Sequence, residues 1–104
     1  MIYLSDHEGG QIRLSDQRRS HILEHPEMVG LDAEIGMTVR DPEIVLRSRT
    51  DESVRLYYRS CQTTIVGRKW LCVVVKYTSG KDAFVLTAYL TNRPKTGEVL
   101  WPKP

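Results

Sequence analysis

The chain has 104 residues, of which 40% are hydrophobic and 27% are charged, and its formal net charge is +2. This size predicts one small domain, residues 1–104, with a single core. No run approaches the roughly 18 apolar residues of a membrane helix, which argues against a membrane span. The N-terminal sequence has no basic region followed by an apolar one, so the expected compartment is the cytoplasm.

The charge is unevenly distributed along the chain. Residues 1–42 contain 4 basic and 8 acidic side chains, a net charge of −4, whereas residues 43–104 contain 11 basic and 5 acidic side chains, a net charge of +6. A basic C-terminal part suits a phosphate-bearing partner such as RNA, because Lys and Arg release counterions from a polyanion. The alternative is a solvated sheet face whose charges only maintain solubility.

The first 25 residues predict a short β-hairpin and a helix. Strands are expected at residues 2–5 and 11–14, joined by a turn with two adjacent glycines. Ser15 is a natural N-cap for the helix that follows. Pro26 disfavours helical geometry in the residue before it, so the helix is expected to end at His25.

A second helix is expected over residues 30–40, where apolar side chains recur at four-residue spacing. After Pro42 the apolar period changes from 3.6 to 2, and short connections between strands predict antiparallel pairing. The four expected strands are residues 43–49, 53–59, 69–77 and 83–90.

The expected fold class is therefore α+β, with N-terminal helices packed on one face of a four-stranded antiparallel sheet, preceded by a short β-hairpin. The core is expected to cover about residues 12–91. Residues 92–104 contain three prolines and a glycine and are expected to form an irregular tail.

Alternation along the expected strands predicts a polar sheet face that could form a site. The face is expected to collect Tyr57, Arg59, Lys76, Thr87 and Tyr89. Directly opposite residues on paired strands lie about 5 Å apart, so these cations and hydroxyl groups could converge on one anion. Such donors are what phosphoryl chemistry requires. The alternative is an ordinary exposed sheet face in which Lys and Arg protect the edge.

The other chemistry-bearing side chains are histidines and cysteines. His21 and His25 lie four residues apart, on one face of the first helix with Arg18, and could exchange protons near neutral pH. No third ligand completes a metal site with them. Cys61 and Cys72 are expected to be free thiols. No nucleotide-binding motif or nucleophile elbow is present, so no cofactor is expected.

The motif order resembles a known nuclease group. Residues 12–101 contain, in sequence, LSDQRRSHILEHPEM, VRDPEIVLRSR, LYYRS, LCVVVKY and FVLTAYLTNRPKTGEVLW. This order is similar to small phage- and bacterial-type domains of the barnase, EndoU, colicin and RelE-like (BECR-fold) nucleases. The resemblance implies a metal-independent ribonuclease that acts as a toxin and leaves a 2′,3′-cyclic phosphate. It also implies an antitoxin or immunity protein as partner.

The resemblance further implies site residues. A helix histidine, a basic strand residue and hydroxyl groups on the last strand would form the catalytic site: His25 or His21, Arg59 or Lys76, and Thr87 with Tyr89. Tyr57, Arg47 and Arg49 are the candidate RNA-binding residues, and Tyr57 and Tyr89 could stack on unpaired bases.

Two other functions stay open. The basic sheet face could bind RNA or a protein without catalysis, or the chain could be a protein-interaction domain with no role in nucleic-acid binding. Strong salt-dependent RNA binding without product would favour the first. The chain could also form a homodimer.

Overall fold

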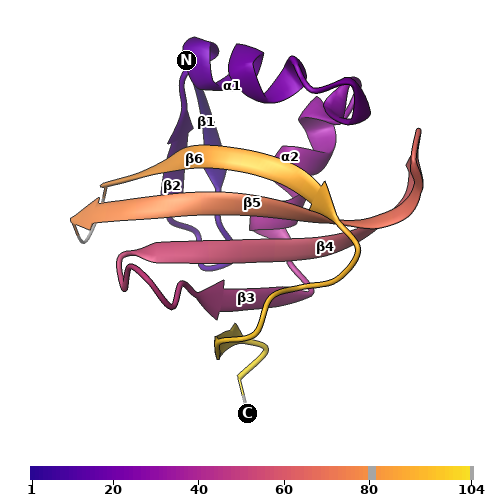
Figure 1. Ribbon diagram of the computed structural model, residues 1–104. Coiled ribbons are helices and arrows are strands. Elements are labelled where there is room, and N and C mark those ends of the chain that lie inside the picture. Colours follow the sequence, from indigo (N-terminus) through magenta and orange to yellow (C-terminus); the bar gives the residue numbers. More distant parts are fainter. Residues whose placement is uncertain (80–81, 104) are drawn as a thin grey trace.

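The computed structural model describes residues 1–79 and 82–103, without the side chain of Thr63 (Figure 1). The N-terminal elements are β1 (Ile2–Ser5), β2 (Gln11–Leu14), α1 (Asp16–Leu23), the 3-10 helix η1 (Pro26–Met28) and α2 (Asp32–Arg40). The later elements are all strands: β3 (Ile44–Arg47), β4 (Val54–Thr64), β5 (Gly67–Ser79), β6 (Asp82–Thr91) and β7 (Glu98–Trp101).

The described strands form one seven-stranded sheet in the order β1-β2-β6-β5-β4-β3-β7. Its neighbouring pairs are antiparallel except for β2 and β6, which pair in parallel with Arg13 opposite Phe84. The predicted fold, a four-stranded antiparallel sheet covered on one face by N-terminal helices, is therefore wrong. The sheet is mixed, it has seven strands, and the two α-helices are short.

Two pairings enlarge the sheet beyond the prediction. The hairpin β1–β2 joins it through β2 and β6, which lie far apart in the sequence. At the other edge β7 pairs with β3, with Glu98 opposite Arg47, in the segment expected to form an irregular tail. Both pairings join strands that are distant in the sequence, so no local sequence pattern predicts them.

The first helix begins at a capping side chain, whereas α2 begins after Leu31 without a side-chain cap. Ser15 Oγ accepts the backbone N–H of Arg18 at 3.2 Å, as expected for the N-cap of α1. α1 lies along β6, and Arg18 Nη1 donates to the Leu86 carbonyl at 2.8 Å. α2 packs against β1, β4 and β5. Within the described ranges no helix is long and apolar enough to cross a membrane.

The sheet has one covered face and one open face. Figure 1 shows β1 and β2 crossing behind β4–β6, with α2 beside them. The larger core cluster fills this covered face and includes Ile12, Ile35, Tyr57 and Val73. A smaller cluster, which includes Leu56, Tyr58 and Cys72, lies on the open face. Residues 92–97 reach this cluster, because the backbone N–H of Lys95 donates to Tyr58 Oη at 3.2 Å.

The register divides the polar set that the sequence placed on one face. Tyr57 pairs with Val73, and Val73 with Ala88, in a row on the covered face. Tyr58 pairs with Cys72, and Cys72 with Tyr89, in a row on the open face. By alternation, Arg59 belongs with the covered row, whereas Lys76, Thr87 and Tyr89 belong with the open row.

A β-bulge in β6 explains part of this difference. Val74 pairs with Thr87 and Val75 with Val85, so Leu86 has no opposite residue on β5. Strict alternation therefore fails at this point, and both Leu86 and Tyr89 belong to the open-face cluster. The sequence pattern alone gave no sign of the inserted residue.

Candidate functional site

The open face carries a groove of about 620 Å³, which we call the sheet groove. Its floor is formed by Val54, Leu56, Val74 and Leu86, from three neighbouring strands, with Thr87 and Tyr89 beside them. Its rim comes from the end of β3, from the β3–β4 loop and from residues 92–97, and includes Arg47, Arg49, Asp51, Lys95 and Thr96. The groove therefore combines an apolar floor with a polar, largely cationic rim.

The rim is cationic around Arg49. Arg49 Nη1 donates to Thr96 Oγ1 at 3.1 Å, which joins the β3–β4 loop to residues 92–97. Arg49, Lys95 and Arg93 also line an adjoining hollow of about 590 Å³, and these three side chains are exposed. An anion at this rim would therefore meet several positive charges from two segments.

Arg47 is partly neutralised at the same rim. Its Nε lies 3.1 Å from Glu98 Oε1, in an ion pair between β3 and β7, although the angle is not that of a hydrogen bond. The free positive charge of the rim is therefore concentrated on Arg49, Arg93 and Lys95.

Asp51 holds Lys76 beside the groove. Lys76 Nζ donates to Asp51 Oδ2 at 2.7 Å, and the backbone N–H and hydroxyl of Ser53 donate to Oδ1 at 2.9 and 2.6 Å. The hydrogen bond from Lys76, followed by those from Ser53, lowers the pKa of Asp51. The carboxylate therefore stays ionised and offsets the charge of Lys76.

Tyr58, Cys72 and Tyr89 form a row across β4, β5 and β6. Burial raises the pKa of Tyr58 to about 12 and also raises the pKa values of Tyr89 and Cys72. At neutral pH the two phenols are therefore hydrogen-bond donors, and the thiol is a poor nucleophile. Cys61 and Cys72 are both buried and free, as expected.

The structure brings only some of the predicted site residues together. Arg47, Arg49, Thr87 and Tyr89 all line the sheet groove, and Lys76 contacts it through Asp51.

The other predicted residues lie elsewhere. Tyr57 is buried on the covered face, where its hydroxyl lies 2.5 Å from that of Tyr77. Arg59 Nη1 donates to the carbonyl of Asp41 at 2.6 Å. His21 is exposed on α1, whereas His25 is exposed in extended backbone before η1, so the expectation that the helix reaches His25 is wrong. The two imidazole ring centroids lie 6.3 Å apart. None of these four residues lines the sheet groove as the structure describes it.

The sequence interpretation missed Asp51, Tyr58, Lys95 and Thr96. The segment NRPK carries two cations around a proline, and this cluster of charge was the available signal for Lys95. It was overlooked because the segment was expected to be an irregular tail.

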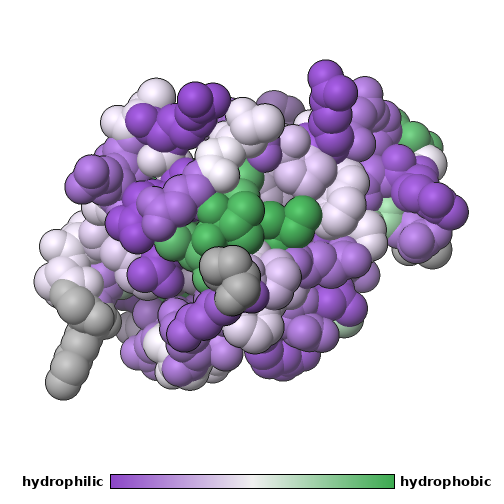
Figure 2. Space-filling model, turned by 90° about the horizontal axis from the view of Figure 1, so that it is seen from below, coloured by the Kyte–Doolittle hydropathy of each residue, from purple (hydrophilic) through white to green (hydrophobic). Residues whose placement is uncertain are grey.

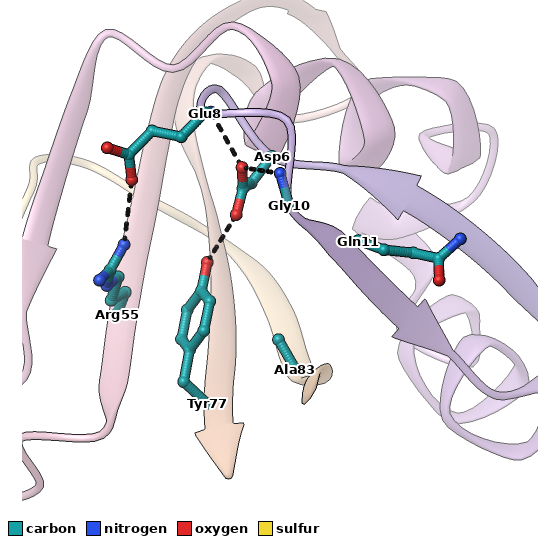
Figure 3. Close-up of a pocket in the computed structure, with 7 residues that line it drawn as sticks. All are labelled: Asp6, Glu8, Gly10, Gln11, Arg55, Tyr77 and Ala83. Carbon is teal, nitrogen blue, oxygen red and sulfur yellow. Dashed lines mark hydrogen bonds and ion pairs between the residues drawn. The ribbon is translucent and has the colours of Figure 1, made fainter. Parts of the chain in front are cut away.

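A second hollow, of about 420 Å³, lies on the covered side between the β1–β2 turn and the sheet (Figure 3). Asp6 Oδ1 accepts the backbone N–H groups of Gly10 and Glu8 at 2.7 and 2.9 Å, and Tyr77 donates to Oδ2 at 3.2 Å. The Arg55 guanidinium lies 4.5 Å from the centre of the Tyr77 ring. These side chains serve one another as partners, so the cluster joins the hairpin to the sheet.

The β7 end of the molecule has a different surface. Figure 2 views the protein from this end and shows a hydrophobic area surrounded by hydrophilic surface. β7 exposes Val99 and Trp101, at 49% and 38% of their surface. The apolar character of this end contrasts with the exposed cations at the rim of the sheet groove.

Comparison of the chain with protein-family models, with curated proteins and with solved structures finds no match. Among residues 1–79 and 82–103, no group of three or more His, Cys, Asp and Glu side chains is placed to hold a metal ion. The resemblance to BECR-fold nucleases therefore depends on the sequence motifs alone.

Proposed function

We propose that this domain binds RNA in the sheet groove and cleaves it without a metal ion. The observation that carries the proposal is the meeting, in one groove, of the exposed cations Arg49 and Lys95 with the hydroxyl groups of Thr87 and Tyr89. These groups come from the β3–β4 loop and from the continuous segment that runs from β6 into residues 92–97, so the fold brings together two distant parts of the sequence.

The cations supply affinity for the RNA backbone. Arg49 and Lys95 can each neutralise a phosphate charge, and Arg93 extends the same rim beyond the groove. The fork of the Arg49 guanidinium matches two phosphate oxygens. Its hydrogen bond to Thr96 holds it at the rim, which reduces the entropy lost on binding.

The same groups favour cleavage by the neighbouring 2′-hydroxyl. The 2′-oxygen forms a bond to phosphorus while the bond to the 5′-oxygen breaks, which gives a 2′,3′-cyclic phosphate and a 5′-hydroxyl. The 2′-hydroxyl loses its proton to solvent and the leaving oxygen takes one from solvent. Arg49 and Lys95 stabilise the additional negative charge of the transition state, and the Tyr89 hydroxyl donates to one of its oxygens.

His21 and His25 remain predictions as proton carriers, because the resemblance assigns them while the groove does not include them. Loss of activity in His21→Ala or His25→Ala would identify the residue.

The test is incubation of purified protein with total RNA in EDTA, followed by analysis of the fragment ends. We expect cyclic-phosphate ends from the parent protein and at least a tenfold loss of rate for Arg49→Ala, because a charge-assisted contact contributes about 1.5–3 kcal/mol. Arg68→Ala is the matched control, since Arg68 is also exposed but lies near the β4–β5 turn. Equal rates for the two variants would contradict the proposal.

One observation favours a second candidate, RNA binding without cleavage. Hydrogen bonds from Lys76 and Ser53 lower the pKa of Asp51 in the groove. Burial raises the pKa values of Tyr58 and Tyr89, so both phenols stay protonated. These groups are therefore poorly suited to proton transfer at neutral pH. Salt-sensitive binding of RNA that remains intact throughout the incubation would establish this candidate.

The toxin role implied by the resemblance is part of the proposal. It places the site of action in the cytoplasm, where RNA is exposed, and it requires an antitoxin or immunity protein that blocks the cationic rim. Expression in bacterial cells should arrest growth, and the Arg49→Ala variant, expressed at the same level, should not. Equal growth arrest by both proteins would contradict the assignment of toxicity to the groove.

A further inference from the structure

We propose that the apolar floor of the sheet groove is a base subsite, which takes one unpaired nucleobase of single-stranded RNA while Arg49 and Lys95 hold the adjacent phosphate. The inference rests on the proposed function and narrows its substrate from RNA in general to unpaired RNA.

The floor has the size and chemistry that a nucleobase requires. Leu56 is opposite Val74 in the register, and Val74 is opposite Thr87. Neighbouring strands lie about 4.8 Å apart, so three of them present a surface of about 10 Å, wide enough for one flat ring system. Leu56 is nearly buried, whereas Val74 and Leu86 are partly exposed, which leaves apolar surface for a ring to cover.

The bulge in β6 shapes this floor. Leu86 is the residue without an opposite partner on β5, between the pairs formed by Val85 and Thr87. It therefore packs with the open-face cluster, while Thr87 also lines the groove. A bulge that re-aims a side chain in this way places an apolar group and a hydroxyl group side by side. A nucleobase has the corresponding apolar face and polar edge.

Charge at the rim selects the occupant. An apolar floor alone would accept many groups, but Arg49 and Lys95 share the groove with it. A nucleotide combines a flat apolar base with a phosphate a few ångströms away. Thr87 can donate a hydrogen bond to the base edge beside the floor. The Tyr89 phenol donates to the phosphate, and burial keeps it protonated by raising its pKa. In a duplex the bases are stacked and paired, so their faces cannot reach the floor.

The test measures binding of labelled oligonucleotides that cannot be cleaved. The probes are a single-stranded 2′-O-methyl RNA hexamer, a backbone of the same length and charge without bases, and the hexamer paired with its complement. We expect the abasic backbone and the duplex to bind at least tenfold more weakly than the single strand, since base stacking typically contributes about 1–3 kcal/mol.

Two variants on one strand supply the matched comparison. Leu86→Ala removes floor surface, whereas Leu90→Ala removes the same side chain where it packs against the covered-face core. We expect weaker binding of the single strand by Leu86→Ala and unchanged binding by Leu90→Ala. The abasic comparison uses the parent protein, so it stays informative even if a variant folds poorly.

Other outcomes overturn the inference in distinguishable ways. Equal affinity for the abasic backbone would show that the rim binds phosphate alone, which removes the base subsite but leaves RNA binding and cleavage in place. Equal affinity for the duplex would contradict the requirement for unpaired RNA. Equal affinity for a poly-glutamate peptide would show a general site for anions. If the protein neither bound the oligonucleotides nor cleaved RNA, both the base subsite and the proposed function would be wrong.

Discussion

At the scale of single residues, Asp51 sets how much positive charge the sheet groove offers. Its carboxylate lines the groove and holds Lys76 at 2.7 Å. Its negative charge therefore repels a phosphate in the groove. It also pairs with Lys76, which could otherwise contact RNA.

Asp51→Asn should strengthen RNA binding, because it removes a negative charge from the groove and releases Lys76. We expect a fewfold gain in affinity at low salt, measured by fluorescence anisotropy with the uncleavable hexamer. Glu52→Gln changes the neighbouring exposed residue by the same charge and should have a smaller effect. Weaker binding by Asp51→Asn would show that its contacts with Ser53 are needed to shape the rim.

Asp6 should contribute to stability rather than to binding. It is 7% exposed and accepts hydrogen bonds from Gly10, Glu8 and Tyr77. Asp6→Ala leaves these donors unpaired and should lower the free energy of unfolding by about 2 kcal/mol. Glu8→Ala is the control, because its ion pair with Arg55 is long and exposed and should contribute less than about 1 kcal/mol. Urea unfolding measures both, and similar losses would contradict this interpretation.

At the scale of elements, residues 92–97 connect the end of β6 to β7 and carry part of the rim. Two of the hydrogen bonds that hold the segment are at the rim: the Lys95 backbone donates to Tyr58, and Arg49 donates to Thr96. Lys69 also donates to the Asn92 side chain, and Thr91 donates to the Arg93 carbonyl. The position of Lys95 at the groove thus depends on a tyrosine that belongs to the sheet.

Tyr58→Phe should weaken RNA binding without unfolding the protein. The substitution removes the hydroxyl oxygen that accepts the Lys95 N–H. Such a hydrogen bond typically makes a net contribution of about 0.5–1.5 kcal/mol. We expect a two- to tenfold loss of affinity and faster hydrogen exchange at the Lys95 amide. Tyr3→Phe changes a tyrosine that is 57% exposed on β1 and should affect neither quantity.

Local signals predicted several elements of this fold, but distant pairing determined the architecture. Ser15 capped α1 as expected, and residues 44–47, 54–64, 67–79 and 82–91 are strands. No local sequence pattern indicates the parallel pairing of β2 with β6 or the pairing of β7 with β3.

The candidate site was harder to predict than the strands that carry it. Adjacent tyrosines in β4 face opposite sides, and nothing in the sequence shows that Tyr58, rather than Tyr57, lies on the open face. The bulge at Leu86 also changes the side on which later residues of β6 lie. Arg47, Arg49, Thr87 and Tyr89 were identified from sequence, whereas Lys95 required the path of residues 92–97.

At the scale of the whole molecule, buried phenols make the fold sensitive to alkali. Burial raises the pKa of Tyr58 from 10.0 to about 12, and the pKa values of Tyr77 and Tyr89 are also raised. The unfolded chain therefore loses these protons first as pH rises. The stability linked to the neutral phenols is fully present below about pH 10 and is lost as the pH rises towards 12 and above.

This linkage predicts a falling urea midpoint above about pH 10. Tyr58→Phe should make the fall shallower, because one of the shifted groups is removed. Absorbance of the tyrosinate ion, followed in the same samples, reports when the phenols ionise. A midpoint that stays constant up to about pH 11 would contradict the burial of these hydroxyl groups.

The charge of the whole groove offers the most direct test of its assignment to RNA. The measurement is the salt dependence of hexamer binding for the parent protein, for Arg49→Ala/Lys95→Ala and for Arg40→Ala/Arg68→Ala. The last pair removes two exposed cations outside the groove. Loss of two phosphate contacts should reduce the slope of log K against log salt by about 1.4 in the groove variant, with little change in the control. Equal slopes for the two double variants would contradict the assignment of RNA to the sheet groove.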